Sequence, residues 1–579
     1  MAIASAVPVP ASHLDAACDA EPATRAANAV LQAKLPFADN RDFEDAARGL
    51  IAPVPDGIVK TTNGTVLMNL GEYAFIDGEV APATVNPSLW RIARLNMANG
   101  LFKVAERLYQ LRGFDIANLT VIEGDTGLIL IDPLTVAEAS RAALELYFAH
   151  RPKKPVVAVI YTHSHIDHYG GVRGVIDEAD VKAGRVKVIA PNGFMEAVSG
   201  ENVLAGLAMM RRAQFQFGTM LPRGPRGQVD TGLGKAITRG TPGLIEPTML
   251  IARPIEEHTI DGVKIVFQLA PETEAPAEMH MFYPQLRVLN MAENACPLLH
   301  NFIPLRGAVA RDPRIWSKYL ADAMKLYGPG TDVLIGQHHW PVWGREAIVD
   351  YLEAQRDLYK HIHDQTLRYM NQGWRPAEIA EVVDLPPDLA DRWSVRGYYG
   401  TVSHNVKAVY QRYLSWYDGN PATLHALPPA PAAAKFVEYM GGAAAVIARA
   451  KAAGEDGGGV GRRFQGRLAE PLDGVDRVAD LVGDVRYEGA AGVIGEFGLL
   501  QGGSQGVCVS LSLGHVFRQA DQMAQTVVVI GGDLGRLQIA DAAAAVIAAC
   551  TSASTQPASA VRLALATSTL RPRFMRDRL

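Results

Sequence analysis

The stretch YTHSHIDHYGG, residues 161–171, places three histidines and one aspartate within six consecutive positions, from His163 to His168. Histidine is scarce in this chain, with 15 copies in 579 residues. The stretch follows the apolar run KPVVAVIY (residues 154–161), which predicts a buried strand. The four side chains therefore occupy a tight loop at a strand end, where imidazole and carboxylate groups can converge on a divalent metal ion.

This first cluster consists of four potential ligands: His163, His165, Asp167 and His168. One pair would serve one ion, so four potential ligands indicate two ions side by side. The alternative is a chance polar cluster in a loop. Other strand ends help to decide between the two interpretations.

Three further stretches begin with an apolar run and end in residues that can bind a metal. The stretch VKIVFQLAPETEAPAE ends in Glu272, Glu274 and Glu278, and LRVLNMAEN ends in Glu293 and Asn294. The stretch TDVLIGQHHW contains His338 and His339 at its end. A single acid or histidine at a strand end usually faces solvent. Four such ends in one α/β segment instead predict a sheet edge lined with ligands, and a dinuclear site fits that edge.

Three segments follow from the pattern along the chain. Strands and helices alternate up to about residue 345, which predicts an α/β domain over residues 1–345 with a helical N-terminal lead-in. Helical periodicity over 347–370 and 402–420 predicts an all-helical domain over 346–451, with a Pro/Ala linker at 426–434.

Beyond residue 451 the composition changes. All seven Trp and 16 of the 18 Tyr precede residue 420, and no Lys follows Lys451. Residues 452–579 are therefore predicted to be a divergent, poorly defined tail.

Composition excludes several classes of function. Hydrophobic content of 48%, charged content of 20% and a formal net charge of −5 predict a soluble globular protein without nucleic acid as its main partner. No stretch reaches the roughly 18 apolar residues of a membrane span, so stable membrane insertion is not expected. The four cysteines are far apart and imply no disulfide framework. The first residues carry no Lys or Arg before their apolar part, which favours a cytoplasmic location and leaves secretion open.

Longer motifs carry a specific resemblance. They are GFDIANLTVIEGDTGLILIDPL, VVAVIYTHSHIDHYGGVRGV, LPRGPRGQVDTGLGK, TEAPAEM, MAENACPLLHNFIPLRGA, HHWPVWG and GYYGTVSHNVKAVYQRYLSWYDGNP. In this order, from about residue 22 to 450, the chain resembles the zinc-dependent alkylsulfatases of the SDS-hydrolase type, within the metallo-β-lactamase superfamily. The resemblance implies an αββα sandwich, a helical dimerisation domain that makes a homodimer, and hydrolysis of linear alkyl sulfates of the dodecyl sulfate type to alcohol and inorganic sulfate.

The resemblance also assigns two Zn²⁺ ions per chain to named ligands. The matching positions are His163, His165 and Glu274 for the first ion, Asp167, His168 and His338 for the second, and Glu293 as the bridge between them. A metal-bound water held by Glu293 and Asp167 is the implied nucleophile. His339, Glu272 and Glu278 are not expected to be ligands.

The implied substrate is a small amphiphile with an anionic head. Arg306 and Arg311 match sulfate-holding positions, and planar guanidinium groups suit tetrahedral oxyanions. Asn301 opens the same loop, and His404 is a further candidate that is equally well explained as an ordinary helix histidine.

Two positions depart from the family pattern. Phe217 stands where the family often has a tyrosine nearby, and Glu272 stands where it usually has glycine. The likeness also stops near Lys451, before an expected domain similar to sterol carrier protein, so either a reading-frame change or a divergent tail is the hypothesis for residues 452–579.

Two alternatives to alkyl sulfate hydrolysis remain open. One is another hydrolase of the same fold: a lactonase, a thioesterase or a phosphodiesterase. The other is a non-catalytic protein that binds alkyl chains through a degraded site. The arginine loop favours a sulfatase over the first, and the intact set of ligands favours an enzyme over the second.

Overall fold

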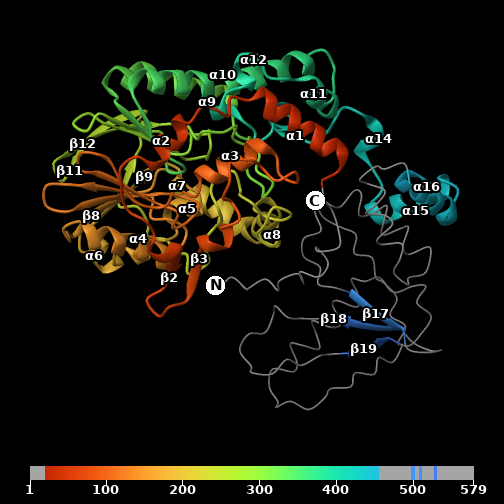
Figure 1. The fold of residues 1–579 in the computed structure, drawn as a ribbon, viewed down its shortest axis with the longest axis horizontal. Coiled ribbons are helices and arrows are strands. Elements are labelled where there is room, and N and C mark those ends of the chain that lie inside the picture. The colour runs from red at the N-terminus through yellow and green to blue at the C-terminus, as the bar shows by residue number, and fades with distance from the viewer. Residues whose placement is uncertain (1–19, 456–496, 502–506, 512–526, 531–579) are drawn as a thin grey trace, which may run out of the picture. The chain divides into compact units, whose positions relative to one another are not determined.

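Two β-sheets lie between layers of helices in the computed structural model (Figure 1), which describes residues 20–455, 497–501, 507–511 and 527–530. Most of the predicted tail (452–579), including the hypothesis of a reading-frame change, therefore lies outside the described residues.

The first sheet has eight strands in the order β1-β4-β5-β6-β7-β8-β9-β10. Its strands are β1 (Leu50–Ala52), β4 (Gly100–Ala105), β5 (Leu108–Arg112), β6 (Leu119–Glu123), β7 (Leu128–Ile131), β8 (Val156–Ile160), β9 (Lys187–Pro191) and β10 (Met249–Ile251). β6 and β7 form an antiparallel hairpin, and β7, β8, β9 and β10 run parallel to one another. The connection from β7 to β8 contains helix α4 (Ala137–His150), because a parallel pair requires a crossover.

The second sheet has six strands in the order β11-β12-β13-β14-β15-β16. They are β11 (Ile255–Ile260), β12 (Val263–Leu269), β13 (Met279–Tyr283), β14 (Val288–Asn290), β15 (Val333–Ile335) and β16 (Val342–Trp343). All neighbouring pairs are antiparallel except β14 and β15, which α9 (Pro313–Tyr327) connects.

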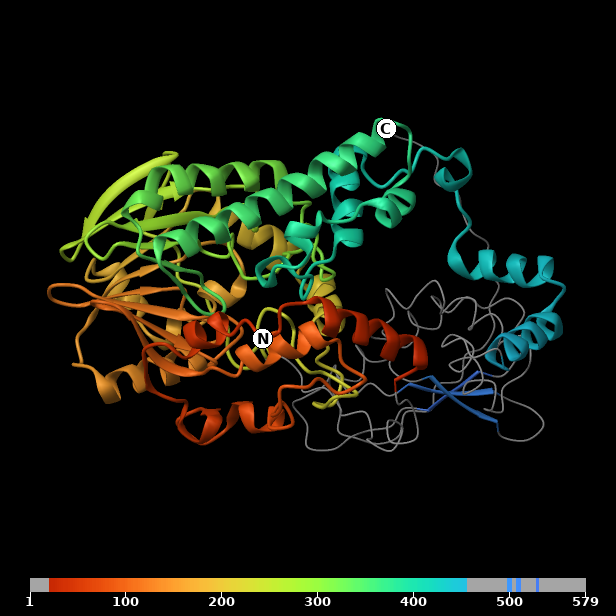
Figure 2. The same cartoon turned by 45° about the horizontal axis from the view of Figure 1, so that its top comes forward.

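The two sheets enclose one apolar layer and present their other faces to helices. Buried side chains from both sheets, such as Ile129 of β7 and Phe267 of β12, share a single core cluster. Figure 2 shows α4 on one outer side and α9 with α10 (Arg345–Met370) on the opposite side. This is the expected αββα sandwich.

The remaining elements complete the description. The helices are α1 (Pro22–Lys34), α2 (Arg41–Ala47), α3 (Pro87–Leu95), α5 (Ile166–Tyr169), α6 (Glu178–Lys182), α7 (Phe194–Val198), α8 (Gly206–Gln216), α11 (Pro376–Val382), α12 (Pro387–Ala390), α13 (Val402–Leu414), α14 (Pro421–Leu424), α15 (Pro429–Tyr439) and α16 (Ala443–Glu455). A two-stranded sheet pairs β2 (Ile58–Lys60) with β3 (Val66–Asn69), and a separate antiparallel sheet contains β17 (Phe497–Gln501), β18 (Val507–Leu511) and β19 (Val527–Ile530).

The helical segment packs onto the second sheet instead of forming an isolated core. Leu289 of β14, Trp316 of α9 and Tyr359 of α10 belong to one buried cluster, in which the Trp316 and Tyr359 rings lie 4.6 Å apart. By its contacts the chain divides into two compact units, Met1–Gly492 and Val493–Leu579. The predicted boundary between the α/β and helical domains, after residue 345, lies within the first unit.

The predicted linker at 426–434 is wrong in part, because α15 begins at Pro429. Proline is well tolerated in the first turn of a helix, where its missing N–H has no intrahelical partner, and the alanines that follow favour helix. Within the described part of the chain, no helix is both long and apolar enough to cross a membrane, and the location of the protein stays a prediction.

Candidate metal centre and substrate site

The polar side chains that follow four strands meet at one edge of the sandwich. His163 comes just after β8, and the single turn α5 carries Asp167 and His168. Glu274 follows β12, Glu293 follows β14 and His338 follows β15. These connections bring all seven predicted ligands together in two groups that share Glu293.

The first group contains His163, His165, Glu274 and Glu293, all buried. Oε2 of Glu274 lies 2.8 Å from Nδ1 of His165 and 3.4 Å from Nε2 of His163. Oε2 of Glu293 lies 3.3 Å from the same nitrogen of His163. Four ligand atoms thus surround one point, within 4.8 Å of one another.

The second group contains Asp167, His168, Glu293 and His338. Oε2 of Glu293 lies 3.2 Å from Nε2 of His168 and 3.1 Å from Nε2 of His338. The carboxylate of Asp167 lies 3.4 Å from Nε2 of His168. One carboxylate oxygen of Glu293 therefore faces both groups, as a bridging ligand would.

The chemistry of these atoms fits divalent metal ions. Nε2 of His163 and Oε2 of Glu274 are buried and make no hydrogen bond. Buried polar atoms without partners are rare in folded proteins, and these two converge with other nitrogen and oxygen donors. Histidine nitrogen and carboxylate oxygen are ligands that zinc and related ions accept.

Neighbouring groups fix the orientation of the imidazoles. Nδ1 of His168 lies 2.8 Å from Oδ2 of Asp132, and Nδ1 of His338 lies 2.9 Å from the carbonyl oxygen of Ile116. Each contact holds the ring with Nε2 toward the cluster, which is how metal-ligating histidines are usually supported. Asp132 was not predicted from the sequence, although it directly follows β7.

Glu278, which was not expected to be a ligand, lies outside both groups and supports them. Its side chain is fully buried. It accepts hydrogen bonds from the backbone N–H of Glu293 at 3.2 Å and from that of Ala275 at 3.1 Å. Burial, and then the carboxylates of Glu274 and Glu293, raise the pKa of Glu278 well above its usual range. The neutral form of Glu278 is thereby favoured, so its side chain holds the backbone at Ala275 and Glu293 without adding a negative charge to the site.

Glu201 is a second supporting residue that the sequence did not indicate. It lies in a turn of π-helix, Ser199–Leu204, with Oε2 3.4 Å from Nε2 of His165 and 3.2 Å from Nη1 of Arg306. Burial opposes ionisation, but His165 and Arg306 outweigh it and lower the pKa of Glu201 to about 2. No motif marks this residue, and a π-helical turn is difficult to predict from periodicity.

The arginine loop flanks the first group. Nη2 of Arg311 contacts Oε1 of Glu274, and Nη1 of Arg311 lies 2.7 Å from both the carbonyl and the side-chain oxygen of Asn301. Arg306 lies against Glu201, which in turn contacts His165 of the same group. The structure therefore places Asn301, Arg306 and Arg311 beside the ligands.

His404 is not brought into the site. Its amide donates to Oγ1 of Thr401 at the start of α13, and its exposed ring makes no hydrogen bond or ion pair among the described residues. The next residue faces inward instead: Oδ1 of Asn405 accepts the N–H of Phe302 at 2.9 Å, and its Nδ2 donates to the carbonyl of His300 at 2.8 Å.

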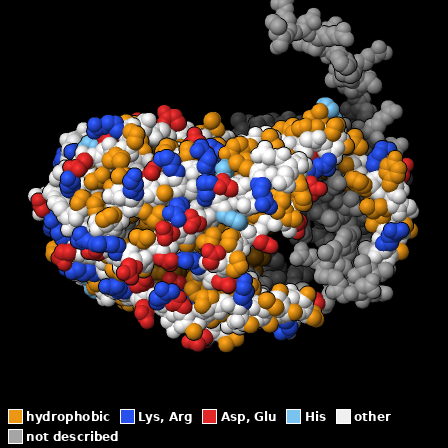
Figure 3. All heavy atoms as spheres, turned by 90° about the horizontal axis from the view of Figure 1, so that it is seen from above, with side chains coloured by type: hydrophobic (Ala, Val, Ile, Leu, Met, Phe, Trp, Pro, Cys, Tyr) orange, Lys and Arg blue, Asp and Glu red, His pale blue; other side chains and the backbone are white. Residues whose placement is uncertain are grey.

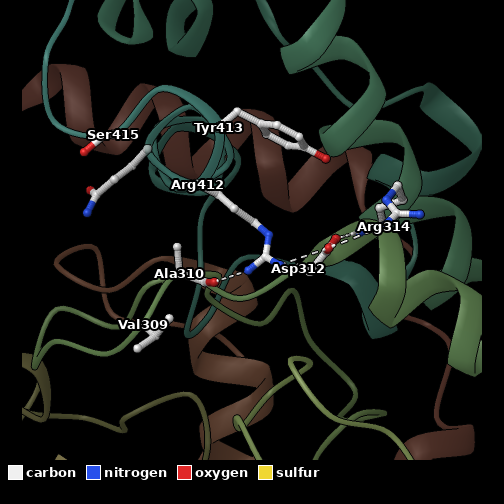
Figure 4. A pocket seen from close by; sticks show the side chains of 8 residues that line it. Val309, Ala310, Asp312, Arg314, Arg412, Tyr413 and Ser415 are labelled. Atoms are coloured by element: carbon white, nitrogen blue, oxygen red, sulfur yellow. Dashed lines mark hydrogen bonds and ion pairs between the residues drawn. The ribbon is translucent and has the colours of Figure 1, made fainter.

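Glu272 turns away from the predicted metal ligands. Its carboxylate lies 2.7 Å from Nη2 of Arg412 on α13, beside an open pocket of about 460 Å³ that Figure 4 shows around Arg412 and Asp312. The backbone of Glu272 has a φ of 62°, in the left-handed region that favours glycine. A family preference for glycine at this position therefore has a conformational reason.

Phe217 is buried against a tyrosine from another segment. Its ring stacks on Tyr399 with centroids 6.3 Å apart, and the Tyr399 hydroxyl accepts from Nε2 of Gln216 at 2.8 Å. The Tyr399 ring also lies 5.0 Å from that of His300, which contacts Glu293 at 3.0 Å. A phenol hydroxyl therefore stands beside Phe217, although it belongs to residue 399.

The fold and the two groups of potential ligands define a protein of the metallo-β-lactamase superfamily with a candidate metal site. Residues 112–338 match the model of the metallo-beta-lactamase superfamily, and residues 375–459 match that of alkyl sulfatase dimerisation. An alkyl/aryl-sulfatase of Saccharomyces cerevisiae is 55% identical over 432 residues, which cover 75% of this chain and 67% of that protein. An (R)-specific secondary-alkylsulfatase of a Pseudomonas species is 53% identical over 444 residues, covering 76% of this chain and 67% of its own length.

A solved structure agrees with these relatives. The stereoselective inverting sec-alkylsulfatase of a Pseudomonas species superposes with a TM-score of 0.76 at 48% identity, covering 83% of this chain and 79% of that one. The chain therefore belongs to the alkylsulfatase family, a family of sulfuric ester hydrolases, as its sequence motifs predicted.

Proposed function

We propose that this protein hydrolyses linear alkyl sulfate esters of the dodecyl sulfate type, using two zinc ions bound by the seven clustered ligands. The ester and water give an alcohol and inorganic sulfate. The observation that carries the proposal is the pair of ligand groups that share Glu293, buried except for the partly exposed Asp167, with Arg306 and Arg311 beside them.

Each part of the site has a role in this proposal. Two bound zinc ions would supply Lewis acidity and a hydroxide nucleophile near neutral pH. Asp167 and Glu293 would hold the attacking water and accept its hydrogen bonds. Arg306 would bind the sulfate oxygens, since a guanidinium group donates several hydrogen bonds to an oxyanion. Arg311, held by Asn301, would orient Glu274 and stabilise negative charge on the sulfate.

We also infer a homodimer formed through the helical segment that matches the dimerisation model, residues 375–459. Sedimentation velocity at micromolar concentration should give twice the mass of the 579-residue chain. A monomer at that concentration would contradict the dimer and leave the proposed reaction untouched.

A substrate panel tests the reaction. The zinc-loaded protein should release inorganic sulfate from primary and secondary alkyl sulfates, measured by ion chromatography, and should not open lactones or cleave thioesters or phosphodiesters at comparable rates. Performing the reaction in ¹⁸O-labelled water assigns the cleaved bond, because the label enters sulfate if sulfur is attacked and alcohol if carbon is attacked. Hydrolysis of one of the other ester classes without sulfate release would replace the proposal with another hydrolase of this fold.

A further inference from the structure

Residues 202–229, which begin in the π-helical turn and contain α8, have an unusual charge composition. The segment has four arginines, Arg211, Arg212, Arg223 and Arg226, and no Asp or Glu, although the chain has 61 acidic residues in 579. Acidic and basic side chains are interspersed on the face that Figure 3 shows. A stretch of 28 residues with only positive charge departs from this mixed pattern.

The same segment exposes many large apolar side chains. α8 has no buried residue. The exposed apolar residues from this part of the chain, with their exposed fractions, are Val203 (72%), Leu204 (85%), Leu207 (62%), Met210 (44%), Phe215 (64%), Met220 (42%) and Leu221 (49%). Single exposed apolar residues are ordinary, but seven within 19 consecutive positions indicate a surface that contacts another apolar phase.

Both ends of this surface contact the proposed sulfate ligand Arg306. Glu201, just before the segment, lies 3.2 Å from Nη1 of Arg306. At the end of α8, Oε1 of Gln216 accepts a hydrogen bond from the backbone N–H of Arg306 at 2.7 Å. Met209 lies between these two residues, within α8, and its sulfur is 3.6 Å from Nη1 of Arg306. The apolar and cationic surface is therefore continuous with the substrate site.

We propose that residues 203–221, which we name the α8 face, dock onto micelles of the anionic amphiphile that the enzyme hydrolyses. This inference rests on the proposed function. An amphipathic helix with arginine and large apolar side chains binds the interface of an anionic aggregate, since its apolar side chains enter the hydrocarbon and its cations meet the head groups. Docking there would present sulfate head groups directly to Arg306.

The charge of the α8 face argues against a second copy of this chain as the occupant. A twofold contact pairs each surface patch with itself, so it would bring the exposed cations Arg211 and Arg212 against an equally cationic patch. Like charges at an interface oppose association. An anionic amphiphile supplies both the missing negative charge and the missing apolar contact.

Binding to mixed micelles tests the proposal without turnover. The probe is a nonionic maltoside micelle with or without a fraction of tetradecyl sulfonate, whose carbon–sulfur bond a sulfate esterase does not hydrolyse. The full-length protein should bind sulfonate-containing micelles about tenfold more tightly than neutral micelles, with weaker binding at high salt. The double variant Leu204→Ser/Leu207→Ser and the double variant Arg211→Gln/Arg212→Gln should each lose most of this binding.

Matched controls come from other exposed helices. Leu326→Ser, at an exposed leucine of α9, and Arg141→Gln, at an exposed arginine of α4, should bind like the unaltered protein. Equal binding by all variants, binding to neutral micelles only, or conversion of Leu204→Ser/Leu207→Ser from dimer to monomer would overturn the proposal. Equal or tighter binding to anionic phospholipid vesicles would also overturn it, in favour of a membrane.

Kinetics separate this inference from the proposed function. The α8 face variants should hydrolyse hexyl sulfate, which stays monomeric, at the unaltered rate. With decyl sulfate the unaltered protein should gain rate above the critical micelle concentration, and the variants should not. No sulfate release from either ester would refute the proposed function, whereas sulfate release without any dependence on aggregation would refute only micelle docking.

Discussion

Glu201 lies with Oε2 3.4 Å from Nε2 of His165, on the side of the imidazole opposite Nδ1, which lies 2.8 Å from Glu274. A carboxylate on this side favours the tautomer with the proton on Nε2, which leaves Nδ1 to face Glu274 and the first ligand group. Because Glu201 also contacts Arg306, one residue supports a proposed zinc ligand and a proposed sulfate ligand together.

Substitution of Glu201 should weaken zinc binding. Loss of a carboxylate that orients a ligating histidine typically lowers metal affinity by about 10–100-fold. Glu201→Gln should therefore lose zinc to a competing chelator at about 10–100-fold lower chelator concentration than the unaltered protein. Glu196→Gln, at an exposed glutamate of the preceding helix α7, is the control. Identical zinc retention in the Glu201 and Glu196 variants would contradict the role of Glu201.

Arg306 should govern substrate binding and leave metal content unchanged. Removal of a charged hydrogen-bond donor costs about 1.5–3 kcal/mol, so Arg306→Ala should raise KM for alkyl sulfates by about 10–100-fold. Arg306→Lys keeps the charge without the planar fork and should recover part of this loss. Arg314→Ala, at an arginine whose side chain is 54% exposed, should have the unaltered KM. A normal KM for Arg306→Ala would exclude it as a sulfate ligand.

Glu272 should tolerate glycine because of its backbone conformation. A non-glycine residue with a φ of 62° costs about 1 kcal/mol, while its exposed ion pair with Arg412 contributes less than that. Glu272→Gly should therefore leave Tm unchanged or raise it by about 2 °C, with zinc content unaltered. Glu257→Gly removes an exposed glutamate of β11 that is paired with Lys264 of β12, and it should lower Tm. A larger fall in Tm for Glu272→Gly than for Glu257→Gly would contradict this account.

His280 should make the metal-free protein less stable in mild acid. Burial lowers the pKa of His280 to about 3, and the ring accepts from Nδ2 of Asn294 at 2.8 Å. Below pH 6.5 the unfolded chain binds a proton that the folded chain does not, so stability falls as the pH falls from 6.5 toward 3.

Between pH 7 and pH 5 this loss amounts to about 2 kcal/mol. Denaturant unfolding of the metal-free protein at both pH values measures it. His280→Gln should remove most of this component of the pH dependence, while His361→Gln on α10 should retain it. Equal pH dependence in the two variants would exclude His280 as its source.

The clustering of the two ligand groups could be predicted from sequence, because their residues follow strands whose apolar character is clear, as in KPVVAVIY before His163. Strands that end at one edge of a sandwich bring such residues together. The supporting residues could not be predicted in the same way, because Glu201 lies in a π-helical turn and Asp132 is one acid in a turn with a φ of 54°. α15 was missed because prolines indicate a linker, yet Pro429 stands in the first turn of a helix, where proline is favourable.

Zinc titration of the metal-free protein, with sulfate release from dodecyl sulfate measured at each step, tests the central claim most directly. Activity should rise with added zinc and level off at two ions per chain, with one sulfate formed for each alcohol. Glu293→Gln, which alters the carboxylate that faces both ligand groups, should bind less than two ions and lose activity. Full activity without metal, or zinc saturation at two ions without any sulfate release, would contradict the account.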